Sequence, residues 1–442
     1  MFKTLKNAWK TPELQKKMLF TLFIVLLYRL GATICVPYVD AGVMKAFSSA
    51  YGDSVLGLMS ILSGGAMQYA TLFALSVSPY ITASIVMQLL TIAIPPLERM
   101  AKDGANGQKK INAITRYVTV ALALITSFGY SKLLEKGSNG VSWLVRSDWF
   151  AMIVINACFC AGAALVMWLA ELINEKGIGN GISVILCVNI IASLAGYVRN
   201  LVFDFTSGQW WIGVIVAVVV VIVAIAAVGF VVFVTNSERR IPIQYAKRVV
   251  GRKMYGGQAT NLPIKLNMTG VMPIIFASSI VSIPATITAF MNEGNWFYEF
   301  VENFFAPNTW LYLVLFLVLT VAFSYFYVLI SFNPVEVANN INSNGGAIPG
   351  HRPGRPTVQY INRILKRITL IGAFFLCIVA GVPMLVTVVT SYLAKAGVNV
   401  PGGLSILTFS GSSLLIVVGV ILETIRDLEA QLSLRQSKGF LG

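Results

Sequence analysis

Apolar runs of about twenty residues recur along the whole chain, and they constrain its fold more than any other feature. Each run is long enough to cross the hydrocarbon core of a bilayer as a helix. The runs are apolar on nearly every face, whereas a surface helix of a soluble protein has a polar side. A mean hydropathy of +0.77 agrees with this pattern. The sequence therefore predicts an all-α polytopic membrane protein.

Ten spans are predicted, at about 18–37, 73–96, 117–134, 150–172, 181–201, 212–234, 269–291, 309–332, 368–390 and 405–425. An even number of spans returns the chain to the side from which it started. The count also divides the chain into halves of five spans, 18–205 and 206–425, which enter the membrane from opposite sides. Inverted halves of this kind are common in proteins that move material across membranes.

Lysine and arginine are concentrated on one side of this arrangement. When the loops are assigned alternately, 26 of the 33 Lys and Arg residues fall on the side of the termini and six on the other, with Arg29 inside the first span. Positively charged loops stay in the cytoplasm, so both termini are predicted to be cytoplasmic. The net charge of +15 belongs mostly to that face. It favours anionic lipids and acidic or mixed-charge protein partners, and it does not require nucleic acid.

The two ends of the chain are predicted to lie outside the membrane. Residues 1–17 are basic and roughly amphipathic, which favours a retained helix at the cytoplasmic membrane surface over a cleaved signal peptide. Residues 426–442 form a cytoplasmic tail. The five cysteines lie in or beside apolar runs at spacings that match no metal motif, so they are interpreted as small buried hydrophobic residues.

One apolar stretch is too short to be a span. "SVLGLMSILSGGAMQYATLF", from Ser54 to Phe73, is interrupted by Gly64 and Gly65 and leads directly into the second span. Irregular backbone at membrane depth is tolerated only where protein or a water-filled cavity surrounds it. The stretch is therefore either a half-helix folded back into a central cavity or an interfacial helix on the outer surface. The residues alone leave both readings open.

Two of the spans contain proline together with small polar residues. Pro79 lies near the start of the second span, and Pro273 and Pro284 lie in the seventh. Proline kinks helices, so these two spans are candidates for a seam that opens. Serine and threonine are equally ordinary residues of helix packing in membranes, and this second interpretation also stays open.

The stretch "GGAIPGHRPGRPTVQY", Gly345 to Tyr360, is unusual for so apolar a chain because it is rich in proline, glycine and arginine. It is predicted to be a rigid, extended, basic loop that forms neither a helix nor a buried strand.

The sequence lacks the residues that most enzymes and ion-coupled transporters need. A single histidine argues against His-based metal sites and Ser-His-Asp catalysis, and there is no GxxxxGK[ST] nucleotide loop. A secondary transporter for a small solute would need a polar or charged site at the midplane. A membrane-embedded enzyme, such as a lipid transferase, would need clustered carboxylates or histidines. We find neither pattern, and we expect no enzymatic activity, cofactor or metal.

Six stretches together resemble the signature segments of one family. They are "SGGAMQYATLFALSVSPYITASIVMQLL", "EKGIGNGIS", "ERRIPIQYAKR", "LPIKLNMTGVMPIIFASSI", "NPVEVANNINSNGGAIPGHRPGRPT" and "SLLIVVGVILETIRDLEAQL". In this order they are similar to the SecY family, the channel-forming subunits of the bacterial protein translocase. The likeness runs from about Lys3 to Gly439.

The resemblance implies an architecture. The two halves would surround a central hourglass pore, with a lateral gate between the second and seventh spans, flanked by the third and eighth. The stretch at about 55–69 would be the plug, with Leu56, Leu58, Ile61, Leu62, Gly64 and Gly65. The gate would include Ser84, Gln88, Ser278 and Ser279. The pore ring would consist of Ile81, Ile85, Ile182, Leu186, Ile275 and Ile416.

The implied function is a protein-conducting channel. It would pass unfolded polypeptides across the bacterial plasma membrane and release hydrophobic segments sideways into the bilayer. The implied partners are SecE-like and SecG-like small membrane subunits, the SecA motor ATPase, the ribosome, and signal peptides with their nascent polypeptides. Bulky aliphatic side chains suit a ring that closes by dewetting. In each of the pairs Ile81 with Ile85 and Ile182 with Leu186, a spacing of four places both residues on one helix face.

Two cytoplasmic loops, about 235–268 and 333–367, would dock the motor or the ribosome. Their candidate residues are Arg239, Arg240, Lys247, Arg248, Arg252, Arg352 and Arg355. Arginine offers forked donors that lysine does not, although the same charges also serve as a positive-inside topology signal. His351 stands where the family more usually has an aliphatic residue, and "SGSSLLI" departs from the usual start of the tenth span.

Overall fold

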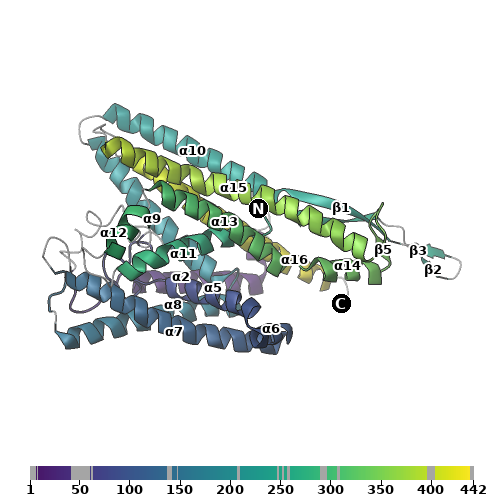
Figure 1. The fold of residues 1–442 in the computed structure, drawn as a ribbon, viewed down its shortest axis with the longest axis horizontal. Helices are drawn as coiled ribbons and strands as arrows, with labels where there is room; N and C mark the ends of the chain where they lie inside the picture. Colours follow the sequence, from purple (N-terminus) through teal and green to yellow (C-terminus); the bar gives the residue numbers. More distant parts are fainter. Residues whose placement is uncertain are drawn as a thin grey trace.

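The computed structural model describes residues 6, 8–40, 60, 63–136, 142–146, 148–206, 210–245, 248–250, 253–255, 259–288, 296–305, 309–395 and 404–438. Within these ranges the chain is mostly helical. Many of the long helices lie roughly along one axis, and a small sheet lies beyond one end of them (Figure 1). The predicted all-α polytopic architecture is confirmed, with a sheet added that the sequence analysis did not predict.

A helix lies at each of the ten predicted spans. In chain order these helices are α2 (Pro12–Gly31), α5 (Ser78–Ala93), α7 (Ala105–Lys136), α8 (Trp149–Lys176), α9 (Gly181–Thr206), α10 (Trp210–Asn236), α11 (Met272–Thr288), α13 (Trp310–Ser331), α15 (Arg355–Lys395) and α16 (Leu404–Lys438).

In the described part of the chain, four helical segments are both long enough and apolar enough to cross a membrane. They are Asn106–Glu135, Trp149–Lys176, Trp310–Ser343 and Arg355–Tyr392. A fifth is formed by α5 and α6 (Pro95–Lys102) together, with a bend of 101° between them. Pro95 and Pro96 stand at this bend, where proline cannot continue the preceding helix. The helix α2 carries Glu13, Lys16, Lys17 and Arg29 within its twenty residues, a higher share of charged residues than in any of these segments.

Two of the first helices begin or end away from the predicted span limits. The helix α2 ends at Gly31 rather than near residue 37, because the chain turns at Ala32 and Pro37 disfavours helical backbone in the residue before it. The backbone at Cys35 then pairs with the backbone at Thr71 in an isolated antiparallel β-bridge. The second span becomes helical only at Ser78, since residues 63–77 form a series of turns.

The prolines of the candidate seam have different positions in their helices. Pro79 lies in the first turn of α5, where proline is well tolerated. Pro273 lies likewise in the first turn of α11, whereas Pro284 lies inside that helix.

A three-stranded antiparallel sheet extends from the end of α10. Its strands are β1 (Glu238–Tyr245), β4 (Ala259–Lys265) and β5 (Gly346–Ala347), in the order β4-β1-β5. Ile241 and Ile243 of β1 are buried while their neighbours along the strand are mostly exposed, as expected where one face of a sheet is covered. A second pair, β2 (Arg248–Val250) and β3 (Lys253–Tyr255), forms a short hairpin.

The prediction for Gly345 to Tyr360 is wrong at both ends of the stretch. Gly346 is buried in β5, and α15 begins at Arg355, with Pro356 in its first turn. Outside the strand and the helix the stretch has only Gly345 and residues 348–354. Positive φ angles of 81° at Gly350 and 102° at Gly354 let residues 348–354 turn sharply. The segment is therefore a compact corner between the sheet and a long helix. Two shorter helices, α12 (Trp296–Phe305) and α14 (Pro334–Ser343), complete the described elements.

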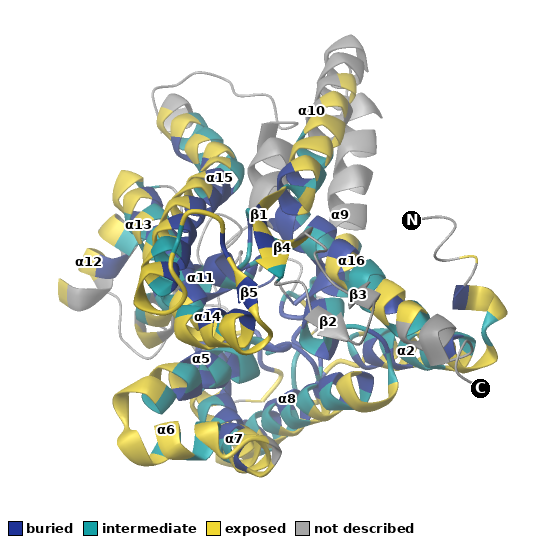
Figure 2. Ribbon diagram, turned by 90° about the vertical axis from the view of Figure 1, so that its right-hand side faces the viewer, coloured by how far each residue is buried: buried dark blue, intermediate teal, exposed yellow. Residues whose placement is uncertain are grey.

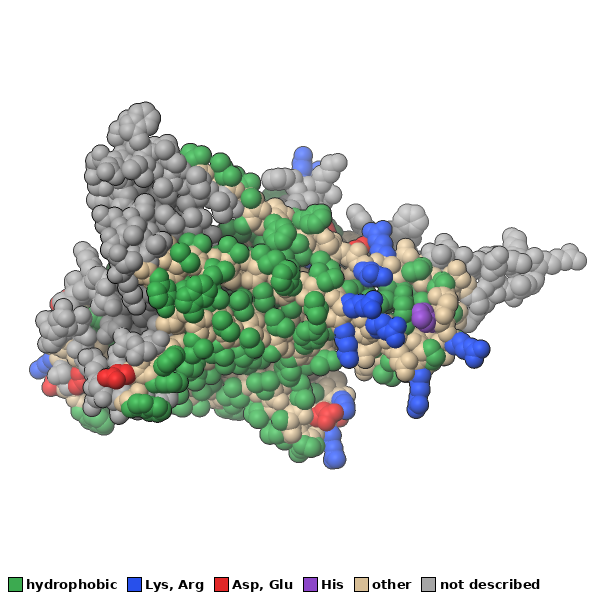
Figure 3. All heavy atoms as spheres, turned by 45° about the horizontal axis from the view of Figure 1, so that its top comes forward, with side chains coloured by type: hydrophobic (Ala, Val, Ile, Leu, Met, Phe, Trp, Pro, Cys, Tyr) green, Lys and Arg blue, Asp and Glu red, His purple; other side chains and the backbone are tan. Residues whose placement is uncertain are grey.

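The main hydrophobic core lies among the long helices. It includes Ile24 and Tyr28 of α2, Ile190 of α9, Phe316 of α13 and Leu376 of α15. Figure 2 shows buried residues on the sides of helices that face one another and exposed residues on their outer sides. Apolar side chains cover much of the middle of the surface, and Lys and Arg gather at the end that carries β5 (Figure 3). This distribution is typical of a protein whose belt faces lipid.

Candidate functional site

The six predicted ring residues lie on four helices. Ile81 and Ile85 are on α5, Ile182 and Leu186 on α9, Ile275 on α11 and Ile416 on α16. Four of them are at most 7% exposed, and Ile81 and Ile182 are half-buried. The four buried residues therefore lie inside the helix assembly, and the other two are partly covered by it.

One hydrophobic cluster joins five of the six. Leu186, Ile275 and Ile416 are buried members of the cluster, and Ile81 and Ile182 pack against it. Ile85 is 3% exposed but does not belong to that cluster. The helices that carry these residues also meet, because α5 contacts α11 and α9 contacts α16.

Neighbouring residues on the same helices show that this burial is selective. On α5, Ile85 is 3% exposed, whereas the next residue, Val86, is 36% exposed and Ile92 is 52% exposed. On α11, Ile275 is 7% exposed and Ile283 is 40% exposed. Each helix thus presents one aliphatic face inward and another outward.

The four predicted gate residues lie on α5 and α11, which contact each other. Ser84, Gln88, Ser278 and Ser279 are all half-buried. The hydroxyls of Ser278 and Ser279 donate to the Ile275 carbonyl within α11, at 2.9 and 2.8 Å. The helices predicted to flank the gate are neighbours of these two, since α5 contacts α7 and α11 contacts α13.

Most of the predicted plug lies outside the described residues, namely Leu56, Leu58, Ile61 and Leu62. Gly64 and Gly65 are described, and both have the left-handed backbone that favours glycine, with φ of 67° and 82°. The Gly65 N–H donates to the Ser60 carbonyl at 2.9 Å, and the Met67 N–H donates to the Ser63 hydroxyl at 3.1 Å.

A buried polar group next to the ring helices was missed by the sequence analysis. The Asn189 amide of α9 donates to the Ser76 hydroxyl at 3.0 Å, and that hydroxyl lies 3.2 Å from the Tyr28 hydroxyl of α2. Tyr28 also stacks on Phe73, with ring centroids 5.4 Å apart. In the sequence, the polar residue Asn189 within a mostly apolar run could have indicated this group. Its partners could not be identified, because they are distant in sequence.

The predicted docking residues lie at the end of the molecule that carries the sheet. Arg239 and Arg240 are exposed on β1, and Arg352 and Arg355 are exposed at the corner before and at the start of α15. Lys247 and Arg252 lie outside the described residues, and the side chain of Arg248, in β2, is also not described. The corner is held by the Thr357 hydroxyl, which donates to the Arg352 carbonyl at 2.8 Å. The ring of His351 lies 4.0 Å from that of Tyr360, centroid to centroid.

Arg426 joins the last helix to the C-terminal end of α10, close to a second basic residue, Lys265. The Arg426 guanidinium of α16 donates to the Thr235 carbonyl and to the Asn236 side chain, at 3.0 and 2.9 Å. Partial burial, and after it the nearby Arg426, lowers the pKa of the Lys265 ammonium at the end of β4.

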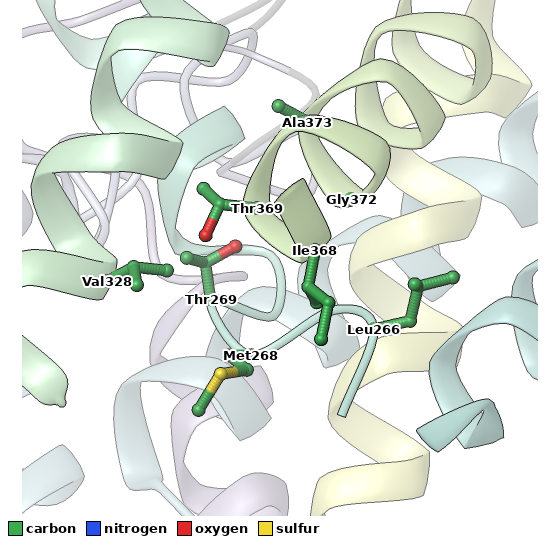
Figure 4. Close-up of a pocket in the computed structure, with 8 residues that line it drawn as sticks. All are labelled: Leu266, Met268, Thr269, Val328, Ile368, Thr369, Gly372 and Ala373. Carbon is green, nitrogen blue, oxygen red and sulfur yellow. The ribbon is translucent and has the colours of Figure 1, made fainter. Parts of the chain in front are cut away.

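The pocket drawn in Figure 4 is small and lies between the segment after β4 and the helices α13 and α15. Its lining residues are Leu266, Met268, Thr269, Val328, Ile368, Thr369, Gly372 and Ala373. The Thr269 hydroxyl donates to the Asn267 side chain at 3.2 Å, and the Thr369 hydroxyl to the Leu365 carbonyl at 2.8 Å. These hydroxyls are satisfied within their own segments, so we assign no ligand to the pocket. Among the described residues there is no group of three or more His, Cys, Asp or Glu suited to a metal ion.

Comparison with known proteins gives one consistent result. The SecY family profile matches residues 71–425. The protein translocase subunit SecY of Streptomyces griseus is 42% identical over 451 residues, with 100% of each chain covered. A solved SecY structure, whose plug domain is described as stabilising the closed state of the translocation channel and maintaining a membrane seal, has a TM-score of 0.62 at 16% identity. That likeness covers 94% of this chain and 92% of that one.

A second solved structure is Sec61 in the canine ribosome–channel complex from the endoplasmic reticulum. It has a TM-score of 0.61 at 13% identity and covers 94% of this chain and 92% of that one. At such low identity these two structures show a shared fold. The sequence likeness to the bacterial relative extends over the whole chain.

Proposed function

Since the chain belongs to the SecY family, we propose that its six inward-facing aliphatic residues form the constriction of a protein-conducting channel. The chain is a translocase subunit that passes unfolded polypeptides across the membrane and releases hydrophobic segments into the bilayer. It is a channel subunit and not an enzyme.

The observation that carries this proposal is the burial of the ring candidates between the two halves of the chain. Helices α5 and α9 belong to the first half and α11 and α16 to the second, yet five of the six residues share one hydrophobic cluster. A narrow passage lined by bulky aliphatic side chains closes by dewetting, because it offers ions nothing in place of their hydration shell. The same side chains yield around a passing peptide of any sequence.

Contact between α5 and α11 supports a lateral gate at this seam. The hydroxyls of Ser278 and Ser279 already donate within α11. Parting the two helices would therefore leave neither hydroxyl without an acceptor, which lowers the cost of opening towards lipid. Ser84 and Gln88 on α5 complete the proposed gate.

The residues at about 55–69 are proposed as the plug on the strength of the family relationship. The described turn at Gly64 and Gly65 supports this assignment, because it leads from that stretch into the segment packed beside α9.

The exposed arginines at the sheet end are proposed to dock the partners that supply polypeptide, namely the SecA motor ATPase and the ribosome. Arg239 and Arg240 on β1 and Arg352 and Arg355 near β5 belong to one sheet-linked unit, because β1 and β5 pair through Gln244 and Ala347. A structural relative is a ribosome-bound channel, which supports the second of these partners.

The remaining partners and the location are proposed from the family relationship and the charge distribution. We propose SecE-like and SecG-like small subunits beside the helices, with signal peptides and nascent polypeptides as clients. Anionic lipids would bind the basic end. The protein would lie in the bacterial plasma membrane with both termini in the cytoplasm.

Site-directed crosslinking tests whether the ring lines the path of a polypeptide. In a chain without native cysteines, Ile85→Cys and Ile275→Cys should each crosslink to a stalled secretory chain in assembled translocase. The matched controls are Ile92→Cys and Ile283→Cys, which lie on the same two helices but are 52% and 40% exposed in the wild type. These controls should crosslink weakly to a hydrophilic stretch of the stalled chain. Stronger crosslinking at the controls than at the ring would overturn the proposal.

A further inference from the structure

Arg29 is a charged residue in an apolar helix, and the proposed channel function gives it no role. It lies in the last turn of α2 and is half-buried. Its Nη2 atom donates to the Val188 carbonyl of α9 at 2.9 Å. A cation near a helix C-terminus is favourable in itself, but this bond goes to a different helix. A guanidinium at this depth needs polar partners, and its partners indicate what it holds.

The guanidinium also lies directly against the turn at Gly64. A Cβ atom added to Gly64 would lie 3.0 Å from Arg29 Nη1 and 3.1 Å from Arg29 Nη2. It would also lie 3.0 Å from the Asn189 side-chain oxygen. The next residue, Gly65, has the same left-handed backbone, but a Cβ there would meet nothing within 4 Å. Arg29 therefore occupies the space on one side of this turn and bonds to α9 at the same time.

The other end of the same segment is fixed to the same two helices. Ser76 lies between the Asn189 amide of α9 and the Tyr28 hydroxyl of α2, at 3.0 and 3.2 Å. Between the two ends, Phe73 packs so closely on Gly31 that a Cβ there would lie 2.1 Å from its ring. The Tyr130 hydroxyl of α7 donates to the Met67 carbonyl. The segment from residue 63 to residue 76 is thus held along its length, and Arg29 supplies a charged side chain to these contacts.

These contacts involve α9, which carries two ring residues, and the residue two places before α5, which carries two more. Val188 follows Leu186 by two residues on α9, and Ser76 precedes α5, which carries Ile81 and Ile85. A displacement of the turn at Gly64 therefore breaks contacts next to the constriction. Hydrogen bonds from a charged donor are stronger than those from neutral groups.

We propose that Arg29 is a positioning residue that clamps the turn at Gly64 against α9 and so favours the closed channel. The proposal rests on the channel function proposed above. Loss of the forked guanidinium should raise the population of the open state at rest by at least about tenfold, as expected for the loss of a charged hydrogen bond. Arg29→Lys keeps the charge but lacks the fork, so it should have a smaller effect.

The two adjacent glycines give a matched test. Gly64→Ala and Gly65→Ala introduce the same left-handed strain, but only the first places a methyl group against Arg29 and Asn189. The ion conductance of assembled translocase in planar bilayers, without substrate, should rise for Gly64→Ala and for Arg29→Gln and stay near the wild-type value for Gly65→Ala. In an Arg29→Ala background, the difference between the two alanine variants should shrink.

Conductance separates this role from a merely structural one, because a misfolded variant also loses translocation and an unclamped variant keeps it. If Arg29→Gln does not assemble, the comparison of Gly64→Ala with Gly65→Ala decides the question alone. Equal resting conductance for those two variants would overturn the clamp while leaving the channel function intact. A wild-type complex that conducts no ions even with a substrate present would instead refute the channel function, and the clamp with it.

Discussion

At the scale of single residues, close packing between segments depends on glycines that leave no space for a methyl group. Gly162 of α8 is one example, because a Cβ there would lie 1.9 Å from the backbone oxygen of Leu72. Gly229 of α10 is also helical, but a Cβ there would meet nothing within 4 Å. The two positions have the same helical context and differ in their surroundings.

Gly162→Ala should lower the free energy of unfolding by about 1–3 kcal/mol, since overpacking forces the neighbouring backbone to move. Gly229→Ala should be neutral or stabilise by up to about 1 kcal/mol, because alanine is the better helix former. Thermal unfolding of the purified protein in detergent measures both changes. Equal shifts of the midpoint for the two variants would contradict the packing described for α8.

Lys265 gives a prediction with a defined pH dependence. Its pKa is lowered in the folded protein, so the unfolded chain binds the proton more tightly. Stability contributed by this residue should therefore rise with pH through the window between the lowered pKa and the ordinary value of 10.5. Lys265→Met should be at least as stable as the wild type at pH 7, and its advantage should shrink towards pH 10. Urea or thermal unfolding at the two pH values tests this, and an advantage that grows with pH would contradict it.

At the scale of elements, the compact corner between β5 and α15 presents basic side chains at the sheet end. Arg352 lies in this corner, and its backbone is fixed by Thr357. Arg363 lies two turns into α15, and it is also exposed. Comparing substitutions at Arg352 and Arg363 therefore separates the effect of a residue's position from the effect of its charge.

Arg352→Glu should strongly reduce motor-driven secretion, because it reverses a charge in the proposed docking surface, while membrane insertion of the protein itself stays normal. Arg363→Glu changes the net charge equally and should have a much smaller effect. Secretion of a reporter protein, normalised to the amount of membrane-inserted channel, provides the measurement. Normal secretion by Arg352→Glu would remove this residue from the docking surface.

At the scale of the whole molecule, the charge distribution predicts which end faces the cytoplasm. Arg352 is exposed at the sheet end, and Val145 is 68% exposed in the connection between α7 and α8, on the predicted opposite side. In a chain without native cysteines, a membrane-impermeant maleimide added to intact cells should label Val145→Cys. It should label Arg352→Cys only after the membrane is opened. The reverse pattern would invert the proposed topology.

The sequence could predict the number and order of the membrane helices because apolar length is a local property. It could not predict the sheet, since in β1 only Ile241 and Ile243 alternate with exposed residues and the partner strand begins fourteen residues after β1 ends. Nor could it predict the contact of Ser76 with Tyr28 and Asn189, which are 48 and 113 residues away. The ring residues came from the family resemblance, because one aliphatic residue in a span looks like any other.

The most direct test of the account is the resting ion conductance of assembled translocase with its ring made small and polar. Replacing Ile81, Ile85, Ile182 and Ile275 with serine removes the apolar lining that keeps the constriction dry. The variant should conduct ions without substrate, whereas the wild type should conduct only while a polypeptide opens it. Conductance as low as that of the wild type, in a variant that folds and assembles, would contradict the assignment of these residues to the pore.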